Sequence, residues 1–155
     1  MTRAAERGSV SIEVAVLAPA FIALMVLAGV AGRSAVAAEA LDAAAHDAAR
    51  AASIARNPAD GRKAARNAAQ QQLDWRGLRC SGTPTLTFSG TVGRDTTDFD
   101  SAYETSLGQD ATVTVTIACR VSFRDLRLSA VPGMPSENRI EASFTSPLDR
   151  YRSRG

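Results

Sequence analysis

The sequence predicts an α+β protein. A long N-terminal helix crosses a membrane and continues into an alanine-rich helix, and a second helix and a small antiparallel sheet of three to four strands follow. Residues 14–32 are apolar and uncharged, and residues 34–57 are rich in alanine, the best helix former. After residue 82, apolar side chains recur at every second position, which is the period of a strand.

The apolar run of residues 14–32 is long enough to span a bilayer. At about 1.5 Å per residue it covers about 28 Å, close to the hydrocarbon thickness. Arg3 and Arg7 precede it, and by the positive-inside rule they keep the N-terminus in the cytoplasm. We therefore expect a single-pass protein of the cell membrane, with a cytoplasmic leader over residues 1–8, a transmembrane segment over 9–33 and an extracytoplasmic domain over 34–148.

The membrane helix is expected to run on into the domain, from Val10 to Arg56. Pro19 lies inside it, removes one backbone hydrogen bond and is expected to kink the axis. The alanine-rich part has small side chains on most faces, which favours close packing by a sheet, a second helix or identical neighbours. Its polar residues are three and four apart and share one stripe, where Asp42 is expected to pair with His46. The stripe contains Glu39, Asp42, His46, Arg50 and Ser53.

A second helix is predicted from Pro58 to Trp75. Asn57 is a good N-cap residue, and proline is favoured at the first helical position. Trp75, at the end, is expected to anchor the core. The predicted inner face contains Ala65, Ala68, Ala69, Gln72 and Leu73.

Alternation predicts three strands, over residues 83–92, 112–123 and 138–146. Residues 93–109 are expected to form a polar loop, residues 125–131 a short strand or turn, residues 132–135 a loop and residues 149–155 a disordered tail. In the last strand Ile140, Ala142 and Phe144 are expected to face inward.

Cys80 and Cys119 are the only cysteines. A structural zinc site needs four ligands, and His46 is the only histidine, so no metal site is expected. A Cys80–Cys119 disulfide fits if the domain lies outside the cytosol, and two unrelated buried thiols are the alternative.

The sequence shows no sign of catalytic chemistry. It has no Ser/His/Asp set with supporting context, no glycine-rich phosphate loop and no zinc-protease helix motif, so we expect no enzyme, no catalytic residue and no cofactor. The net charge of +2 does not favour nucleic acid as a partner. Four carboxylates in residues 95–104 lack the ligand order of a calcium loop, and an acidic solvated loop is expected.

The start of the chain resembles a known class of membrane proteins. Gly8 is followed by the residues SVSIE and then by the long apolar helix, a pattern that resembles the type IV prepilins. With Pro19 six residues after Glu13, the pattern looks more specifically like the TadE family of Flp pilus assembly proteins. The resemblance implies a pilin-like α+β fold, cleavage by a prepilin peptidase between Gly8 and Ser9, and an assembly contact from Glu13 to the new N-terminus of the adjacent subunit.

The predicted function is therefore that of a membrane-anchored minor pilin-like protein, because the domain is larger than that of the small major Flp pilin. The resemblance implies that its partners are the prepilin peptidase, other Tad/Flp pilins, inner-membrane platform proteins and membrane lipid. The alternative is a small secreted binding protein, released by signal peptidase at an Ala-x-Ala site near Ala38.

Overall fold

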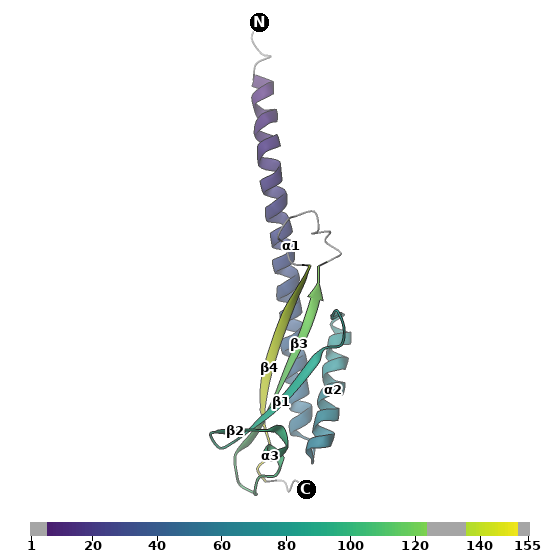
Figure 1. Cartoon of the computed structure of the whole chain (residues 1–155), viewed down its shortest axis with the longest axis vertical. Coiled ribbons are helices and arrows are strands. Elements are labelled where there is room, and N and C mark those ends of the chain that lie inside the picture. The colour runs from purple at the N-terminus through teal and green to yellow at the C-terminus, as the bar shows by residue number, and fades with distance from the viewer. Residues whose placement is uncertain (1–5, 124–135, 152–155) are drawn as a thin grey trace.

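The computed structural model describes residues 6–123 and 136–151, with side chains described from Glu13 onward. The first helix, α1, covers Glu6–Ser53 and contains 48 residues. Its first half projects alone, and its second half lies within a domain of one further long helix, one short helix and a sheet (Figure 1). The predicted α+β class is confirmed.

The helix α1 ends three residues before its predicted end at Arg56. Ser53 donates its hydroxyl hydrogen to the Arg50 carbonyl at 3.0 Å, and the chain then turns. The turn is needed because Asn57 has an extended backbone (φ −138°, ψ 159°) and caps the next helix, accepting from the Asp60 amide at 2.8 Å. An N-cap residue cannot also belong to the preceding helix.

The second helix, α2, covers Pro58–Trp75, as predicted. Its buried residues lie four apart: Gly61, Ala65, Ala69 and Leu73. The expectation that Trp75 anchors the core is wrong, because its side chain is 76% exposed. Leu73 occupies the core position of the last turn, and a residue two places later faces the opposite side of a helix.

Four antiparallel strands form one sheet in the order β2-β1-β3-β4. The three predicted strands are confirmed as β1 (Thr85–Val92), β3 (Ala111–Ser122) and β4 (Glu137–Pro147). The segment predicted as a polar loop instead contains β2 (Asp95–Thr97) and the short helix α3 (Phe99–Tyr103). The helix forms because Phe99, Ala102 and Tyr103 are spaced to share one face, and all three are buried.

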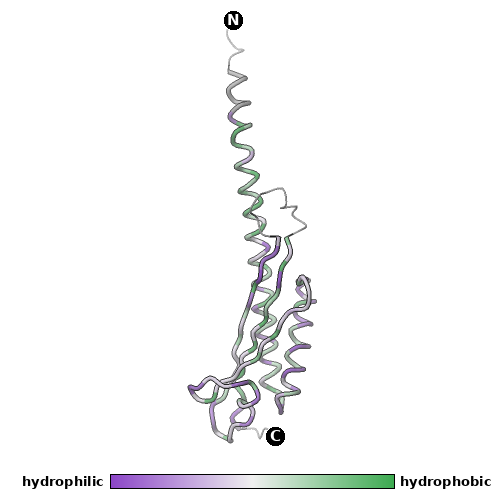
Figure 2. The backbone as a smooth tube through the Cα atoms, viewed as in Figure 1, coloured by the Kyte–Doolittle hydropathy of each residue, from purple (hydrophilic) through white to green (hydrophobic). Residues whose placement is uncertain are grey.

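The core lies between the sheet and the two long helices. The second half of α1 packs on β3 and β4 and alongside α2, so the alternatives for its alanine-rich face resolve to a sheet and a second helix. The opposite face of the sheet carries hydroxyl pairs, among them Thr91 with Thr112 at 2.7 Å and Thr114 with Thr145 at 2.7 Å. Figure 2 shows that hydrophobic residues predominate along the projecting half of α1, whereas hydrophobic and hydrophilic residues are interspersed along its domain half.

Two side chains on α1 and β4 differ from expectation. Ala142 is buried and Ile140 partly buried as predicted, but Phe144 is 39% exposed and its ring meets His46 edge-on at 4.5 Å. The His46 ring turns toward this contact, so its Nδ1 lies 3.1 Å from Asp47 and the predicted pairing with Asp42 is wrong.

Residues 149–151, which the sequence assigns to a disordered tail, lie against the domain. The Arg150 guanidinium pairs with Asp110 at 2.5 Å. The backbone carbonyl of Arg150 accepts a hydrogen bond from the Gly108 amide at 2.9 Å. Leu148, just before them, is buried and holds the chain in place. The remaining tail, the predicted turn and loop over residues 125–135 and the first five leader residues lie outside the described residues.

Candidate functional site

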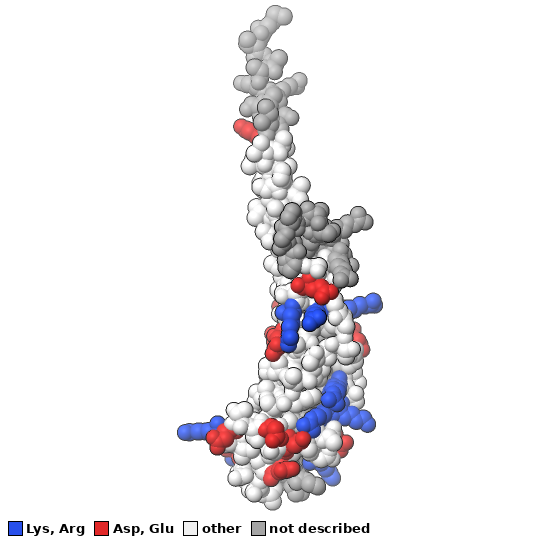
Figure 3. Space-filling view, in the orientation of Figure 1, with Lys and Arg blue, Asp and Glu red and all other residues white. Residues whose placement is uncertain are grey.

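The candidate site is the projecting segment of α1, defined here as residues 13–32. Eight of its large apolar side chains are 49–75% exposed, far more than a soluble domain leaves uncovered in one patch, and only Val26 and Val30 are partly buried against the core. Among the described residues, α1 is the helix that is long and apolar enough to cross a membrane. Figure 3 shows this segment as an almost uncharged surface above a charged domain. The exposed set is Val14, Val16, Leu17, Phe21, Ile22, Leu24, Met25 and Leu27.

Glu13 lies at the N-terminal border of this apolar surface. Its side chain is exposed, and no basic side chain within the described parts of the chain forms an ion pair with it. Such a carboxylate, moved into hydrocarbon without a partner, costs on the order of 3 kcal/mol. Glu13 is therefore an acceptor for which no described residue of the chain supplies a positive partner.

Gly8 and Ser9 lie in the first turns of α1, so their backbone is helical. Ser9 and Glu13 are four positions apart, a spacing that places two residues on the same face of a helix. The structure thus sets the candidate cleavage point one turn from the candidate contact, and cleavage itself stays a prediction.

The helix α1 continues through Pro19 as one element. A proline has no amide hydrogen, so the carbonyl four residues earlier, on Ala15, loses its helical donor. The predicted kink stays a prediction. A side-chain carbon added at Gly29 or Gly32 would meet nothing within 4 Å, so no contact within the described chain requires glycine there.

The comparison with known families finds a match to the first helix. The family model described as TadE-like protein matches residues 8–50, a range that includes Gly8, Ser9, Glu13 and Pro19. The N-terminal helix is TadE-like. This confirms the resemblance read from the sequence and points to a component associated with the Tad pilus. No curated protein and no solved structure matches the chain with significance.

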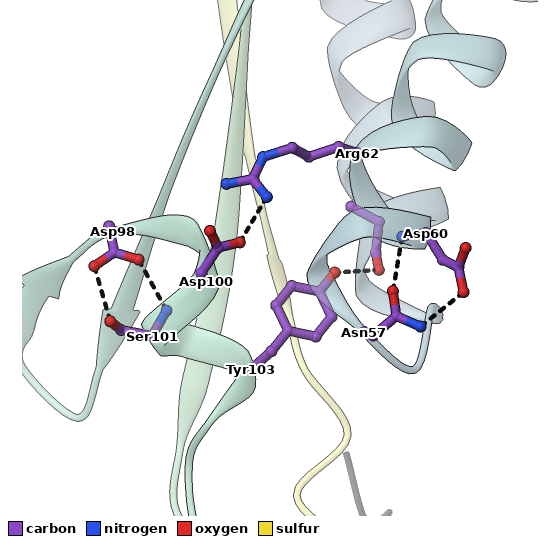
Figure 4. Close-up of polar contacts among 8 residues, drawn as sticks. Asn57, Asp60, Arg62, Asp98, Asp100, Ser101 and Tyr103 are labelled. Atoms are coloured by element: carbon purple, nitrogen blue, oxygen red, sulfur yellow. Dashed lines mark hydrogen bonds and ion pairs between the residues drawn. The ribbon is translucent and has the colours of Figure 1, made fainter. Parts of the chain in front are cut away.

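The TadE-like helix is held firmly where it enters the domain. Eight residues on its inner face are 0–3% exposed: Ala37, Ala40, Leu41, Ala44, Ala45, Ala48, Ala49 and Ala52. At its end, the buried Tyr103 hydroxyl donates to the Ala52 carbonyl at 2.6 Å (Figure 4). The Ala52 carbonyl also accepts from the Ala55 amide at 3.0 Å, so Tyr103 adds a second donor to this carbonyl in the last turn of the helix. The Ser146 hydroxyl donates to the Ser53 hydroxyl at 2.9 Å. The projecting segment is therefore a continuous extension of a packed element.

The short helix α3 positions Tyr103. Asp98 caps α3 by accepting from the Ser101 amide at 2.9 Å and from the Ser101 hydroxyl at 2.8 Å, and these bonds lower the pKa of Asp98. Asp100 pairs with Arg62 of α2 at 2.6 Å, a hydrogen bond that raises the pKa of Arg62 (Figure 4). Together these contacts fix α3 against both long helices.

Two glycines give α3 the space to dock, and sequence reasoning missed this. A side-chain carbon on Gly61 would lie 2.5 Å from the Tyr103 hydroxyl, and one on Gly90 would lie 2.6 Å from Ala102. The signal available in the sequence was the spacing of Phe99 and Tyr103, which suits one helical turn.

The disulfide is present. Cys80 and Cys119 are joined, with their Cα atoms 5.5 Å apart, and the bond links the segment after α2 to β3. Neither of the two cysteines is left free.

The acidic segment around α3 has its own partners. Asp98 caps a helix and Asp100 pairs with Arg62, so two of its four carboxylates have structural roles. Within residues 6–123 and 136–151 no three His, Cys, Asp or Glu side chains come close enough to hold a metal ion.

Proposed function

We propose that this protein is a membrane-anchored, minor pilin-like component in the assembly of a Tad-type pilus or a related secretion filament. The carrying observation is the TadE-like helix itself: an exposed apolar segment with Glu13 at its border, continuous with the core of a disulfide-linked domain. An apolar surface of this size is stable when it is covered by lipid or by other apolar helices. The core of a filament would supply such helices.

In this proposal a prepilin peptidase cuts between Gly8 and Ser9, which creates a positive amine at the start of α1. The Glu13 carboxylate of one subunit pairs with that amine on a neighbouring pilin. The pairing offsets the penalty of about 3 kcal/mol for a lone carboxylate in hydrocarbon. Platform proteins of the inner membrane and other Tad pilins are the proposed partners.

The proposed orientation has the N-terminus in the cytoplasm and the domain outside. The Cys80–Cys119 disulfide supports this, because such bonds form and persist in oxidising compartments. We propose no enzymatic activity for the domain, whose described polar contacts serve capping and packing.

The secreted alternative is not favoured. A cut near Ala38 would divide α1 within its packed part, between the buried Ala37 and Ala40, and the apolar run of residues 14–32 is longer than the usual signal core of about 7–15 residues. It would also discard the TadE-like segment that the family model matches.

The first test replaces Glu13 by Gln in cells that assemble the pilus. We expect normal membrane insertion and disulfide formation but loss of most pilus assembly, scored by electron microscopy of surface filaments. Glu39→Gln, an exposed carboxylate on the domain part of the same helix, is the matched control and should assemble normally. Assembly by Glu13→Gln at the level of the control would contradict the proposed role.

A further inference from the structure

We propose that a shallow pocket on the outer face of the sheet, lined by Arg120, Arg139, Ser81, Thr83 and Thr85, binds the phosphate of an anionic phospholipid headgroup. The inference rests on the proposed function only in requiring that the projecting segment spans the bilayer. It adds a second membrane contact, made by the domain.

The pocket brings two cations together. Arg120 and Arg139 are direct partners in the β3–β4 register, and like charges in that arrangement destabilise a sheet unless an anion compensates them. Arg139 has a partial partner in Glu141 at 3.5 Å, and Glu137 lies two residues before it on the same strand face. Arg120 has no carboxylate partner among the described residues, and its side chain is exposed.

Ser81, Thr83 and Thr85, which bear hydroxyl groups, lie on the β1 side of Arg120, and the two glutamates lie on β4 at its other side. Thr85 of β1 is opposite Ala118, two residues before Arg120, and the Ser81 amide donates to the Arg120 carbonyl at 2.7 Å. A planar guanidinium with hydroxyl donors beside it suits the tetrahedral oxygens of a phosphate. The pocket therefore has the chemistry of a phosphate site.

The end of β3 and the start of β4 lie at the end of the domain from which the projecting segment emerges (Figure 1), and Arg120 and Arg139 are each two residues from these strand ends. The strand β4 runs in the same direction as α1, with Phe144 beside His46 and Ser146 beside Ser53. At about 3.3 Å per strand residue and about 1.5 Å per helix residue, Arg139 is level with about Ala37.

This height matches the headgroup layer. Gly32 ends the apolar run, and five helical residues place the level of Ala37 about 8 Å beyond it. A bilayer of about 30 Å of hydrocarbon and about 40–45 Å in total has about 5–8 Å of headgroup on each side. An extended arginine side chain that starts at this level reaches the phosphates.

Trp75 supports the same contact independently. It is the only tryptophan, 76% exposed, and the Arg76 guanidinium lies 5.3 Å from its ring. It ends α2 five residues before Cys80, which the disulfide joins to Cys119 beside Arg120. Exposed tryptophan and arginine are typical of surfaces at the membrane interface.

The test uses the full chain in phosphatidylcholine nanodiscs that contain increasing fractions of anionic phosphatidylglycerol. The readout is quenching of the single tryptophan by neutral acrylamide. We expect quenching to fall as the anionic lipid rises. Arg120→Gln should raise the midpoint fraction about fivefold, and the double variant with Arg139→Gln should raise it about twentyfold, so that no transition is reached.

The matched control is the double variant Arg56→Gln and Arg94→Gln, which removes two exposed arginines at the far end of the domain and should leave the midpoint unchanged. An equal shift in this control, or an unchanged midpoint in the Arg120 and Arg139 variants, overturns the inference. Protection by inorganic phosphate alone, in pure phosphatidylcholine nanodiscs, overturns the lipid assignment. Co-elution with the nanodisc is scored separately: a chain that fails to insert contradicts the proposed function, whereas an inserted chain without lipid dependence overturns this inference alone.

Discussion

At the scale of single residues, the domain depends on close approaches that only small side chains permit. Gly90 of β1 lies under Ala102 of α3, and a side-chain carbon there would also lie 3.0 Å from the Asp98 carbonyl oxygen. The backbone oxygen cannot move without displacing the cap of α3. Only glycine fits at position 90, because the short helix lies directly on the strand there.

We predict that Gly90→Ala lowers the free energy of unfolding by about 1–3 kcal/mol, the usual range for overpacking a close contact. Urea denaturation of the full chain in detergent, followed by circular dichroism, measures it. Gly29→Ala, where nothing lies within 4 Å, is the control and should leave the midpoint within error or raise it slightly. Equal stability of both variants would show that α3 does not dock on β1 as described.

At the scale of elements, α3 depends on its N-cap. Folding lowers the pKa of Asp98, chiefly through the hydrogen bond from the Ser101 amide. A carboxyl group whose pKa is lower in the folded state stabilises the fold above its unfolded pKa, about 3.9, and this contribution is lost as the pH falls below that value.

Asp98→Asn keeps a capping side chain but removes the titrating group. We therefore predict that at neutral pH this variant loses only the stabilisation that comes from the Asp98 charge, and that its free energy of unfolding changes less than that of the wild type below about pH 4. Thermal melts between neutral and acidic pH measure both profiles. Parallel profiles for the two proteins would contradict the assigned cap. Asp95→Asn, an exposed neighbour in β2 that caps no helix, serves as the control.

The sequence predicts the long elements well because their signals are local. Residues close together in the chain determine three features: the alanine-rich part of α1, the start of α2 at Asn57-Pro58 and the alternation of β3. The same local reading fails at α3, at Trp75 and at the partner of His46. Each of these is decided by contacts between distant segments: Tyr103 with Ala52, the core position taken by Leu73, and Phe144 against His46.

The functional residues also differ in how far the sequence predicts them. Gly8, Glu13 and Pro19 lie within 12 residues of one another and are recognised from sequence alone. The pocket at Arg120 and Arg139 requires the β3–β4 register, which no local pattern gives.

At the scale of the whole molecule, the disulfide ties the second helix to the sheet across 39 residues of sequence. We predict that replacing Cys80 and Cys119 by Ala lowers the free energy of unfolding by about 4 kcal/mol, from the loop-closure entropy of a loop of this length. Chemical denaturation of the oxidised wild type and the double variant measures it, and reduced wild type is the control that should approach the variant. A loss under about 1 kcal/mol would mean that packing alone fixes the segment after α2.

The central claim is that the projecting segment is an assembly helix that matures by cleavage after Gly8. N-terminal sequencing of the protein purified from cell membranes tests it most directly. The account predicts a mature chain that begins at Ser9 and keeps Glu13 and the whole apolar run. A chain that begins beyond Ala38, or one that keeps Met1 in cells with an active prepilin peptidase, would contradict it.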